Sequence, residues 1–140
     1  MPEKTAEEFT HDGYFITGDV GRQDADGRVW ISGRAKDLII SGGFNVYPKE
    51  VEEAIDALPG VVESAVIGVP HPDFGEGVVA LVVPKPDASL TPEGIVAAIA
   101  PGLARFKQPK RVLIVPDLPR NAMGKVQKAE LRKTHSGLFV

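Results

Sequence analysis

The sequence predicts an α+β fold: a small mixed sheet of about three strands, flanked by helices and preceded by a β-hairpin. Three observations predict it. Residues 61–69 and 78–83 are runs rich in β-branched side chains and of strand length. Two segments that open with proline show apolar residues at helical spacing. An Asp-Gly pair at residues 26–27 separates two short extended segments, as in a tight hairpin.

The hairpin comes first in the chain. Its strands are predicted at residues 20–23 and 28–31, and Gly27 supplies the positive φ that the turn needs. Just before it, Thr17-Gly18-Asp19 is predicted to end an apolar strand in a turn. A two-stranded hairpin is only marginally stable in water, so residues 1–35 are expected to need a neighbour.

From Lys36 onward the chain has the pattern of a compact domain. A strand is predicted at residues 38–40, followed by a glycine turn at residues 41–43. Pro48 opens a helix, where its missing N–H has no cost, and Pro59-Gly60 ends it. One face of this helix is apolar: Val51, Ala54, Ile55 and Leu58.

Further strands and helices are predicted in the second half of the chain. The runs at residues 61–69 and 78–83 are predicted as strands joined through a Pro- and Gly-containing turn. Pro92 opens a second helix that places Ile95, Val96 and Ile99 inward and ends at Pro101-Gly102. A strand at residues 112–115 then leads into a polar loop and a final helix near residues 127–133.

Composition excludes several classes of function. The 16 Lys and Arg against 19 Asp and Glu give a net charge of −3, which argues against a nucleic-acid module. The chain has no cysteine, which fits a reducing cytoplasm, and its three histidines show no metal-ligand spacing. The polar, acidic first twenty residues do not resemble a signal peptide, and no apolar run could span a membrane. We therefore expect a cytoplasmic protein without membrane or nucleic-acid partners and without a metal site of its own.

The loop before the final helix contains Met123-Gly124-Lys125. A phosphate-binding P-loop requires GxxxxGK followed by Ser or Thr. Here Pro119 stands where the first glycine belongs and Val126 where the hydroxyl residue belongs, which excludes a P-loop. Taken alone, Lys125 would be a solvated surface lysine.

Three further motifs precede it. Tyr14-Phe15-Ile16-Thr17-Gly18-Asp19 is followed by Gly33-Arg34-Ala35-Lys36-Asp37 and then by residues 41–52, Ser-Gly-Gly-Phe-Asn-Val-Tyr-Pro-Lys-Glu-Val-Glu. Individually these motifs are typical of a turn, a solvated charge cluster and a turn before a helix. In this order and with Lys125 after them, they resemble the carboxyl end of the adenylate-forming enzymes, which comprise acyl-CoA synthetases, luciferases and peptide-synthetase adenylation domains.

The resemblance covers residues 5–133. The Asn-Val-Tyr-Pro-Lys-Glu-Val-Glu string at residues 45–52 is similar to acyl-CoA synthetases and favours CoA as the acyl acceptor. Residues 14–19 and the Gly-Lys-Val-Gln-Lys string at residues 124–128 are most similar to bacterial malonyl-CoA synthetases. A medium-chain or aryl acyl-CoA ligase is the alternative within the family.

The resemblance implies roles for individual residues. Asp19 would bind the ATP ribose, Arg34 would contact the nucleotide, and Lys36 would be the hinge about which a small domain rotates. Gly42 and Gly43 would form the backbone edge against which the pantetheine arm of CoA lies. Lys125 would reach the carboxylate and the α-phosphate during adenylation. The chain departs from the family pattern at Ile16, where many relatives carry a basic residue.

The resemblance also implies a longer parent enzyme. The ATP loop, the adenine-stacking segment, the magnesium-binding glutamate and the acyl pocket all belong to the family's large N-terminal domain. Residues 1–35 would form the edge of that domain, and residues 36–140 the mobile C-terminal domain. We therefore expect ATP, Mg²⁺ and CoA as cofactors and substrates, with Mg²⁺ bound mainly by the large domain, a small carboxylic acid as substrate, and an inactive chain when it is isolated.

The same residues allow two other interpretations of the chain's function. The isolated chain could serve as a recognition substrate for a protein acetyltransferase at Lys125, with Arg120, Lys128 and Arg132 as basic flanks. Acetylation is implied by the resemblance and would remove the charge that adenylation needs. A KH-like nucleic-acid module is excluded by the net negative charge and by the lack of a basic GxxG loop.

A basic cluster lies just before the last strand and is either a solvated face or a contact for CoA phosphates: Arg105, Lys107, Lys110 and Arg111.

Overall fold

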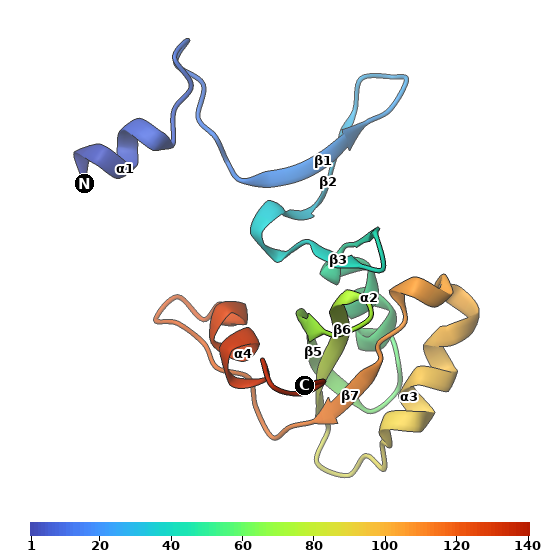
Figure 1. Cartoon of the computed structure of the whole chain (residues 1–140). Coiled ribbons are helices and arrows are strands. Elements are labelled where there is room, and N and C mark those ends of the chain that lie inside the picture. Colours follow the sequence, from blue (N-terminus) through green and yellow to red (C-terminus); the bar gives the residue numbers. More distant parts are fainter. The chain divides into compact units, whose positions relative to one another are not determined.

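The computed structural model describes all residues, Met1–Val140. It divides into two compact units, Met1–Lys36 and Asp37–Val140 (Figure 1). The α+β fold class predicted from the sequence is confirmed, because helices and a mixed sheet pack together in the second unit. None of the helices is both long enough and apolar enough to cross a membrane.

The first unit contains one short helix, α1 (Pro2–Glu7), and the predicted hairpin of β1 (Asp19–Gln23) and β2 (Val29–Arg34). The strands pair in antiparallel fashion. In the hairpin loop, the Asp24 carboxylate accepts hydrogen bonds from the N–H groups of Arg28 at 2.9 Å and Asp26 at 3.0 Å. The bond from Arg28 is the main cause that lowers the pKa of Asp24 below its ordinary 3.8.

The expected apolar strand before Thr17 is wrong. Residues 10–18 contain only an isolated bridge between Phe9 and Phe15, and Asp19 begins strand β1 instead of following a strand. Tyr14 and Phe15 are 72% and 56% exposed. An apolar run therefore did not mean burial against a strand partner within this chain.

The second unit is built on a five-stranded sheet: β3 (Ile39–Ser41), β4 (Phe44–Val46), β5 (Val61–His71), β6 (Gly75–Pro84) and β7 (Arg111–Ile114). The order is β4-β3-β6-β5, and β7 pairs with β6 in parallel while all other pairs are antiparallel. The sheet has more than the expected three or so strands. The additional strand β4 has only three residues, too few for an alternating pattern to reveal it.

Strands β5 and β6 are also longer than predicted. Their ladder runs from Val61 opposite Pro84 to His71 opposite Gly75, with one irregularity between Val61 and Glu63, and leaves only three residues for the turn. The sequence placed a longer turn there because Pro70, Gly75 and Gly77 are punctuating residues. Proline is tolerated here because β5 lies at the edge of the sheet.

Helices cover both faces of this sheet. Alternate side chains of β6 point to opposite sides, so Val78, Ala80 and Val82 join one buried cluster while Val79, Leu81 and Val83 join another. The first cluster packs against α2 (Pro48–Asp56) and α3 (Pro92–Ile99), and the second against α4 (Lys128–Thr134). Figure 1 shows α3 and α4 on opposite sides of the strands. This double coverage explains why β6 is apolar at consecutive positions.

The helix boundaries follow local chemistry. Pro48 and Pro92 both stand at the first turn of their helices, as predicted. Thr91 caps α3, because its hydroxyl accepts the N–H of Gly94 at 3.1 Å. Three short 3₁₀ turns complete the chain: η1 (Ala35–Asp37), η2 (Ala100–Gly102) and η3 (Arg105–Lys107).

Candidate functional site

Lys125 lies in the loop between β7 and α4, as the sequence predicted. Its backbone is a closed turn: Arg120 and Val126 form an antiparallel bridge, and the Asn121 N–H donates to the Lys125 carbonyl at 2.9 Å. The Asn121 side-chain oxygen accepts the N–H groups of Met123 and Lys125, each at 3.0 Å. Gly124 adopts φ +79°, which favours glycine. The Lys125 side chain is exposed and forms no ion pair.

The Arg120 side chain fastens this loop to the sheet. One guanidinium nitrogen donates to the Gly124 carbonyl at 2.8 Å, and another forms an ion pair with Glu63 on β5. The same side chain thus contacts the residue directly before Lys125 and the strand beneath. We infer that the loop holds the base of Lys125 in place while its ammonium group remains free to reach an anion.

The basic residues that flank Lys125 are all paired. Besides Arg120 with Glu63, Lys128 pairs with Glu52 of α2, and Arg132 pairs with Asp37 at 3.1 Å. The acidic partners come from β5, α2 and the start of the second unit. The three expected flanking charges therefore serve to dock the C-terminal segment, and Lys125 stands apart from them as an uncommitted cation.

Gly42 and Gly43 form the two-residue turn between β3 and β4. Their φ values are +59° and +83°, the left-handed conformation at both central residues that defines a type I′ hairpin. The Gly42 N–H donates to the Phe74 carbonyl at 2.9 Å in the β5–β6 turn. A Cβ atom on Gly43 would meet no atom within 4 Å, so the turn presents open backbone there.

These two regions lie at opposite ends of the β5–β6 hairpin. The Lys125 loop is fastened at Glu63, near the first residues of β5, whereas the glycine turn contacts the hairpin's own turn after His71. Eight residues of strand separate Glu63 from His71, and at about 3.3 Å per residue the two ends are about 26 Å apart. Lys125 and Gly43 therefore face different surroundings.

The four basic residues before β7 make different contacts. Lys107 makes a two-oxygen contact with the Glu50 carboxylate, at 2.9 Å to each oxygen. The Lys110 ammonium lies 3.7 Å from the centre of the Phe74 ring, a cation–π contact next to the glycine turn. Arg105 and Arg111 are exposed and form no ion pair. Three cations of the cluster thus remain available to an anion near this end of the hairpin.

In the first unit, Asp19 and Arg34 are cross-strand partners of β1 and β2. The Arg34 Nε lies 3.1 Å from an Asp19 carboxylate oxygen, and its guanidinium also donates to the Thr17 carbonyl at 2.9 Å. Arg34 lines a cavity of about 320 Å³ together with Thr17, Gly18 and Lys36. The two residues expected to contact nucleotide are therefore neighbours, and a carboxylate beside a guanidinium can accept hydroxyl groups and pair with phosphate.

Lys36 is the last residue of the first unit. The residue before it is held, because the Ala35 N–H donates to the Gly18 carbonyl at 2.8 Å. The residue after it is held in the second unit, because Asp37 pairs with Arg132 of α4. Lys36 itself is exposed and has no ion-pair partner. A single residue between two fastened ones can change φ and ψ with little disturbance to either unit.

Comparison with known proteins shows where this arrangement belongs. Residues 50–125 match the family model of the AMP-binding enzyme C-terminal domain, which is more than half of the chain. The chain belongs to this family. The resemblance inferred from the motifs is thereby confirmed, and the match ends at Lys125.

Several relatives that share this C-terminal domain are named as CoA ligases. The chain is 47% identical over 130 residues to the sulfoacetate–CoA ligase of Cupriavidus necator, covering 93% of this chain and 26% of that protein. It is 52% identical over 132 residues to a (methyl-dioxo-octahydro-indenyl)propanoyl:CoA ligase of Rhodococcus jostii, covering 94% and 26%. The crystal structure of ATP-bound MatB from Rhodopseudomonas palustris is 58% identical with a TM-score of 0.91, covering 100% and 28%. The chain thus spans about a quarter of the length of these relatives.

Within this C-terminal domain the sequence interpretation missed the residues that hold the site. The motifs assign no role to Glu63, Glu76 or Asn121, whose contacts hold the glycine turn and the Lys125 loop. One signal was available: Asn121 stands three residues before Gly124, and asparagine side chains often accept backbone N–H groups in such turns. The ion pairs carry no such local signal, because their partners are far apart in sequence.

No group of three or more His, Asp or Glu side chains gathers in a way that could hold a metal ion. No step below uses a metal held by this chain. A phosphate-bearing ligand has cations available to it. Arg105, Lys110 and Lys125 in the second unit form no ion pair, and Arg34 in the first unit lines a cavity of about 320 Å³.

Proposed function

We propose that this chain is the C-terminal part of an ATP-dependent carboxylate–CoA ligase. In the first half-reaction a carboxylate oxygen attacks the α-phosphorus of ATP, the bond to the bridging oxygen breaks, and pyrophosphate leaves. In the second, the thiol sulfur of CoA attacks the acyl carbon, the bond to AMP breaks, and the thiol proton passes to solvent. The products are the acyl-CoA thioester and AMP.

The observation that carries this proposal is the placement of Lys125 and the Gly42-Gly43 turn at opposite ends of one β5–β6 hairpin. An ammonium group can neutralise charge that develops as the carboxylate attacks phosphorus. An open glycine turn allows a narrow chain, such as the pantetheine arm, to pass close to the backbone. Because the two regions contact positions of β5 that are eight residues apart, one active centre would meet them in turn.

Lys36 is proposed as the hinge for this exchange, and Asp19 and Arg34 as the nucleotide contacts of the first unit. The hinge proposal is supported by the fastening of Ala35 and Asp37 on either side of Lys36. The nucleotide proposal is supported by the pairing of Asp19 with Arg34 beside the cavity that Arg34 lines.

The test is a fusion in which this chain replaces the matching segment of Rhodopseudomonas palustris MatB. Pyrophosphate exchange measures the first half-reaction, and thioester formation from supplied acyl-adenylate measures the second. We expect both in the fusion and neither in the 140-residue chain alone. Exchange by the chain alone, or a fusion that lacks both half-reactions although it folds, would contradict the proposal.

The acid is proposed to be malonate. The proposal is supported by the motif resemblance to malonyl-CoA synthetases and by 58% identity to MatB. Sulfoacetate, the acid named for one relative, is likewise a small carboxylic acid whose CH2 group carries a second negative group. The acid named for the other relative is bulky and bicyclic, so ligases that act on different acids share this kind of C-terminal domain. The parent enzyme assayed with malonate, sulfoacetate, a medium-chain fatty acid and an aryl acid would decide.

Acetylation of Lys125 is a second proposal, favoured by one observation: the side chain is exposed on an ordered, hydrogen-bonded loop. The paired state of Arg120, Lys128 and Arg132 means that a modifying enzyme would have to recognise the loop's shape and not free flanking charges. Mass spectrometry after treatment with a protein acetyltransferase should find the acetyl group at Lys125 before Lys133. Equal labelling of the two lysines would contradict selectivity.

A further inference from the structure

The β3–β4 hairpin, which carries the Gly42-Gly43 turn, is joined to β6 at only one ladder position, Ser41 opposite Gly75. Within the hairpin, Ser41 and Phe44 flank the two-residue turn and Ile40 faces Asn45. Hydrogen-bonded and non-hydrogen-bonded pairs alternate along an antiparallel ladder, so Ile40 directs its N–H away from β4. This outward N–H needs a partner elsewhere.

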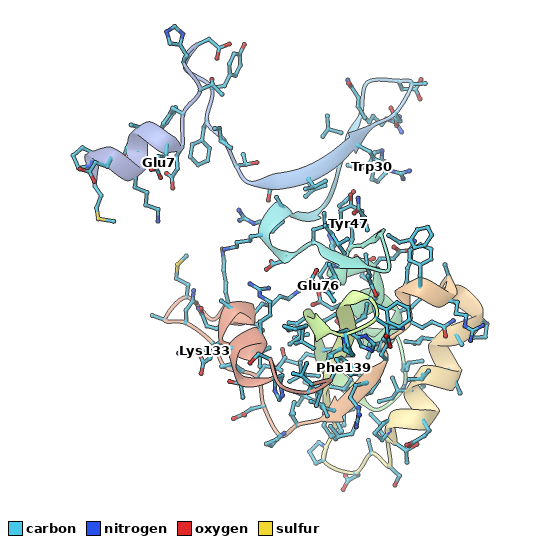
Figure 2. The ribbon with its side chains drawn as sticks, viewed as in Figure 1. Glu7, Trp30, Tyr47, Glu76, Lys133 and Phe139 are labelled. Atoms are coloured by element: carbon cyan, nitrogen blue, oxygen red, sulfur yellow. The ribbon has the colours of Figure 1, made fainter.

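Glu76 of β6 supplies that partner. The Ile40 N–H donates to a Glu76 carboxylate oxygen at 2.8 Å, which extends the single ladder contact between β3 and β6 with a side chain. Glu76 is half-buried and takes part in none of the ion pairs of the chain. Figure 2 shows Glu76 at the end of the β5–β6 hairpin next to β3. The carboxylate is therefore committed to the backbone of the glycine-turn hairpin and to no cation.

Gly68 on β5 makes room for this arrangement. A Cβ atom at Gly68 would lie 2.8 Å from the other Glu76 carboxylate oxygen and 2.9 Å from a methyl carbon of Ile39. The φ of Gly68 is not positive, so its backbone would accept any residue. Glycine is thus required there for space, at the point where the Glu76 side chain reaches across toward β3.

We infer that Glu76 is a positioning residue, which holds the Gly42-Gly43 turn at the place where the thiol arm of CoA passes. This inference rests on the function proposed above for that turn. Glu76 contacts neither substrate directly and acts through the Ile40 N–H. Its loss should weaken use of CoA in the second half-reaction and leave the first, which depends on the opposite end of the hairpin, unaffected.

The contact itself is tested in the 140-residue chain, independently of any activity. Amide hydrogen exchange at Ile40, followed by NMR, should accelerate about tenfold in Glu76→Ala and much less in Glu76→Gln, whose side-chain oxygen still accepts the N–H. Gly68→Ala keeps the carboxylate but crowds it, and should also accelerate exchange at Ile40. Unchanged exchange in both Glu76→Ala and Gly68→Ala would overturn the inference, and if Glu76→Ala does not fold, Gly68→Ala and Glu76→Gln decide.

The functional role is tested in the MatB fusion. Glu76→Ala should raise the KM for CoA about tenfold, with pyrophosphate exchange unchanged and with rescue by Glu76→Gln. Thr91→Ala is the matched control, because the Thr91 hydroxyl likewise accepts a backbone N–H, that of Gly94, at 3.1 Å, but at the start of α3 and outside the proposed site. Thr91→Ala should leave the KM for CoA unchanged.

The outcomes separate the two proposals. Faster Ile40 exchange with an unchanged KM for CoA would overturn the positioning role while leaving the ligase proposal intact. An equal rise in the KM for CoA in Glu76→Ala and Thr91→Ala would also overturn it, since a general loss of stability would explain both. A wild-type fusion without CoA ligation would count against the proposed function itself, and the inference would fall with it.

Discussion

Glu63 and Arg120 are 57 residues apart in sequence and form an ion pair that joins strand β5 to the loop of Lys125. The Arg120 guanidinium also donates to the Gly124 carbonyl, so one side chain connects the strand with the residue before the lysine. Both side chains are partly exposed, Arg120 at 40% and Glu63 at 30%. Solvent screening therefore limits the stability they add, and their main effect is on the geometry of the loop.

Arg120→Ala should slow adenylation more than it destabilises the fold. The free energy of unfolding should fall by only about 0–1 kcal/mol, as for exposed ion pairs. The Lys125 loop loses both the hydrogen bond to the Gly124 carbonyl and the ion pair with Glu63, so the rate of pyrophosphate exchange in the MatB fusion should fall. Lys49→Ala, which breaks the exposed Lys49–Glu53 pair on α2, is the control and should change neither quantity. A stability loss of several kcal/mol with unchanged exchange would refute the geometric role.

Lys125→Ala should remove adenylation and spare thioester formation from supplied acyl-adenylate. Loss of one charge-stabilising group of this kind costs roughly 3–4 kcal/mol, or about 10²–10³-fold in rate. Pyrophosphate exchange and thioester formation are measured separately in the fusion. Lys133→Ala, which removes an exposed lysine of α4, should affect neither. Equal losses in the two half-reactions would contradict the division of roles.

Asn121→Ala should loosen the Lys125 loop, because its side-chain oxygen accepts two backbone N–H groups. Each lost hydrogen bond is worth about 1 kcal/mol net. Amide exchange at Met123 and Lys125 should accelerate together, and Asn121→Asp should restore protection since it keeps the acceptor oxygen. If Asn121→Asp exchanged as fast as Asn121→Ala, the side-chain oxygen would not be what shapes the loop.

Gly43→Leu should abolish CoA turnover and preserve adenylation. Because Gly43 has φ +83°, any side chain there also strains the backbone, and the variant needs a control for strain. Gly27 has the same φ of +83° in the β1–β2 hairpin. Gly27→Leu introduces comparable strain away from the proposed thiol path, so it should leave the KM for CoA unchanged. Similar loss of CoA use in both variants would remove the assignment of Gly43.

Asp56→Asn should stabilise the protein at neutral pH. Partial burial is the main cause that raises the pKa of the Asp56 carboxyl above its ordinary 3.8, and the nearby Glu52 and Glu63 raise it further against the hydrogen bond from Ser64. The native state therefore binds a proton that the unfolded state has released, and stability falls as pH rises from 3.8 through the raised pKa. Urea unfolding should show the variant more stable at pH 7, with the difference vanishing below pH 3.8.

Asp24→Asn is the control, because it should change the free energy of unfolding in the opposite direction. The pKa of Asp24 is lowered, chiefly by the Arg28 N–H, so its contribution is present above pH 3.8 and is lost as pH falls through the lowered value. The variant should be less stable than the wild type at pH 7 and similar to it in acid. Trp30, the single tryptophan, donates its indole N–H to the Asp24 carboxylate at 3.4 Å and reports on this hairpin by fluorescence.

The sequence predicts those parts of the fold that depend on local chemistry. Pro48 and Pro92 mark helix starts, Asp26-Gly27 marks a hairpin, and β-branched runs mark β5 and β6, because each acts within a few residues. Strand β4 escaped prediction since three residues carry no pattern, and the strand before Thr17 was wrongly expected since apolar composition does not determine a pairing partner. The parallel pairing of β7 with β6 depends on tertiary contacts alone.

The candidate site divides in the same way. Lys125, Gly43 and Lys36 stand in recognisable motifs, and the family they indicate is confirmed, while their individual roles stay predictions. Glu63 and Glu76 act across 57 and 36 residues of sequence, and no local signal links them to Arg120 or Ile40. The residues that touch a ligand can thus be proposed from motifs, whereas those that hold them in place become visible only once the chain is folded.

The β5–β6 hairpin makes the two ends of the C-terminal domain mechanically dependent. A stiff rod that swings about one pivot brings one end in as it takes the other end out. If Lys36 is that pivot, the two half-reactions exclude each other in time, and an adenylate cannot be exposed to thiol while Lys125 still covers it. A crosslink that holds Lys125 at the active centre would then stop turnover after the first half-reaction, with one equivalent of pyrophosphate released and no thioester formed.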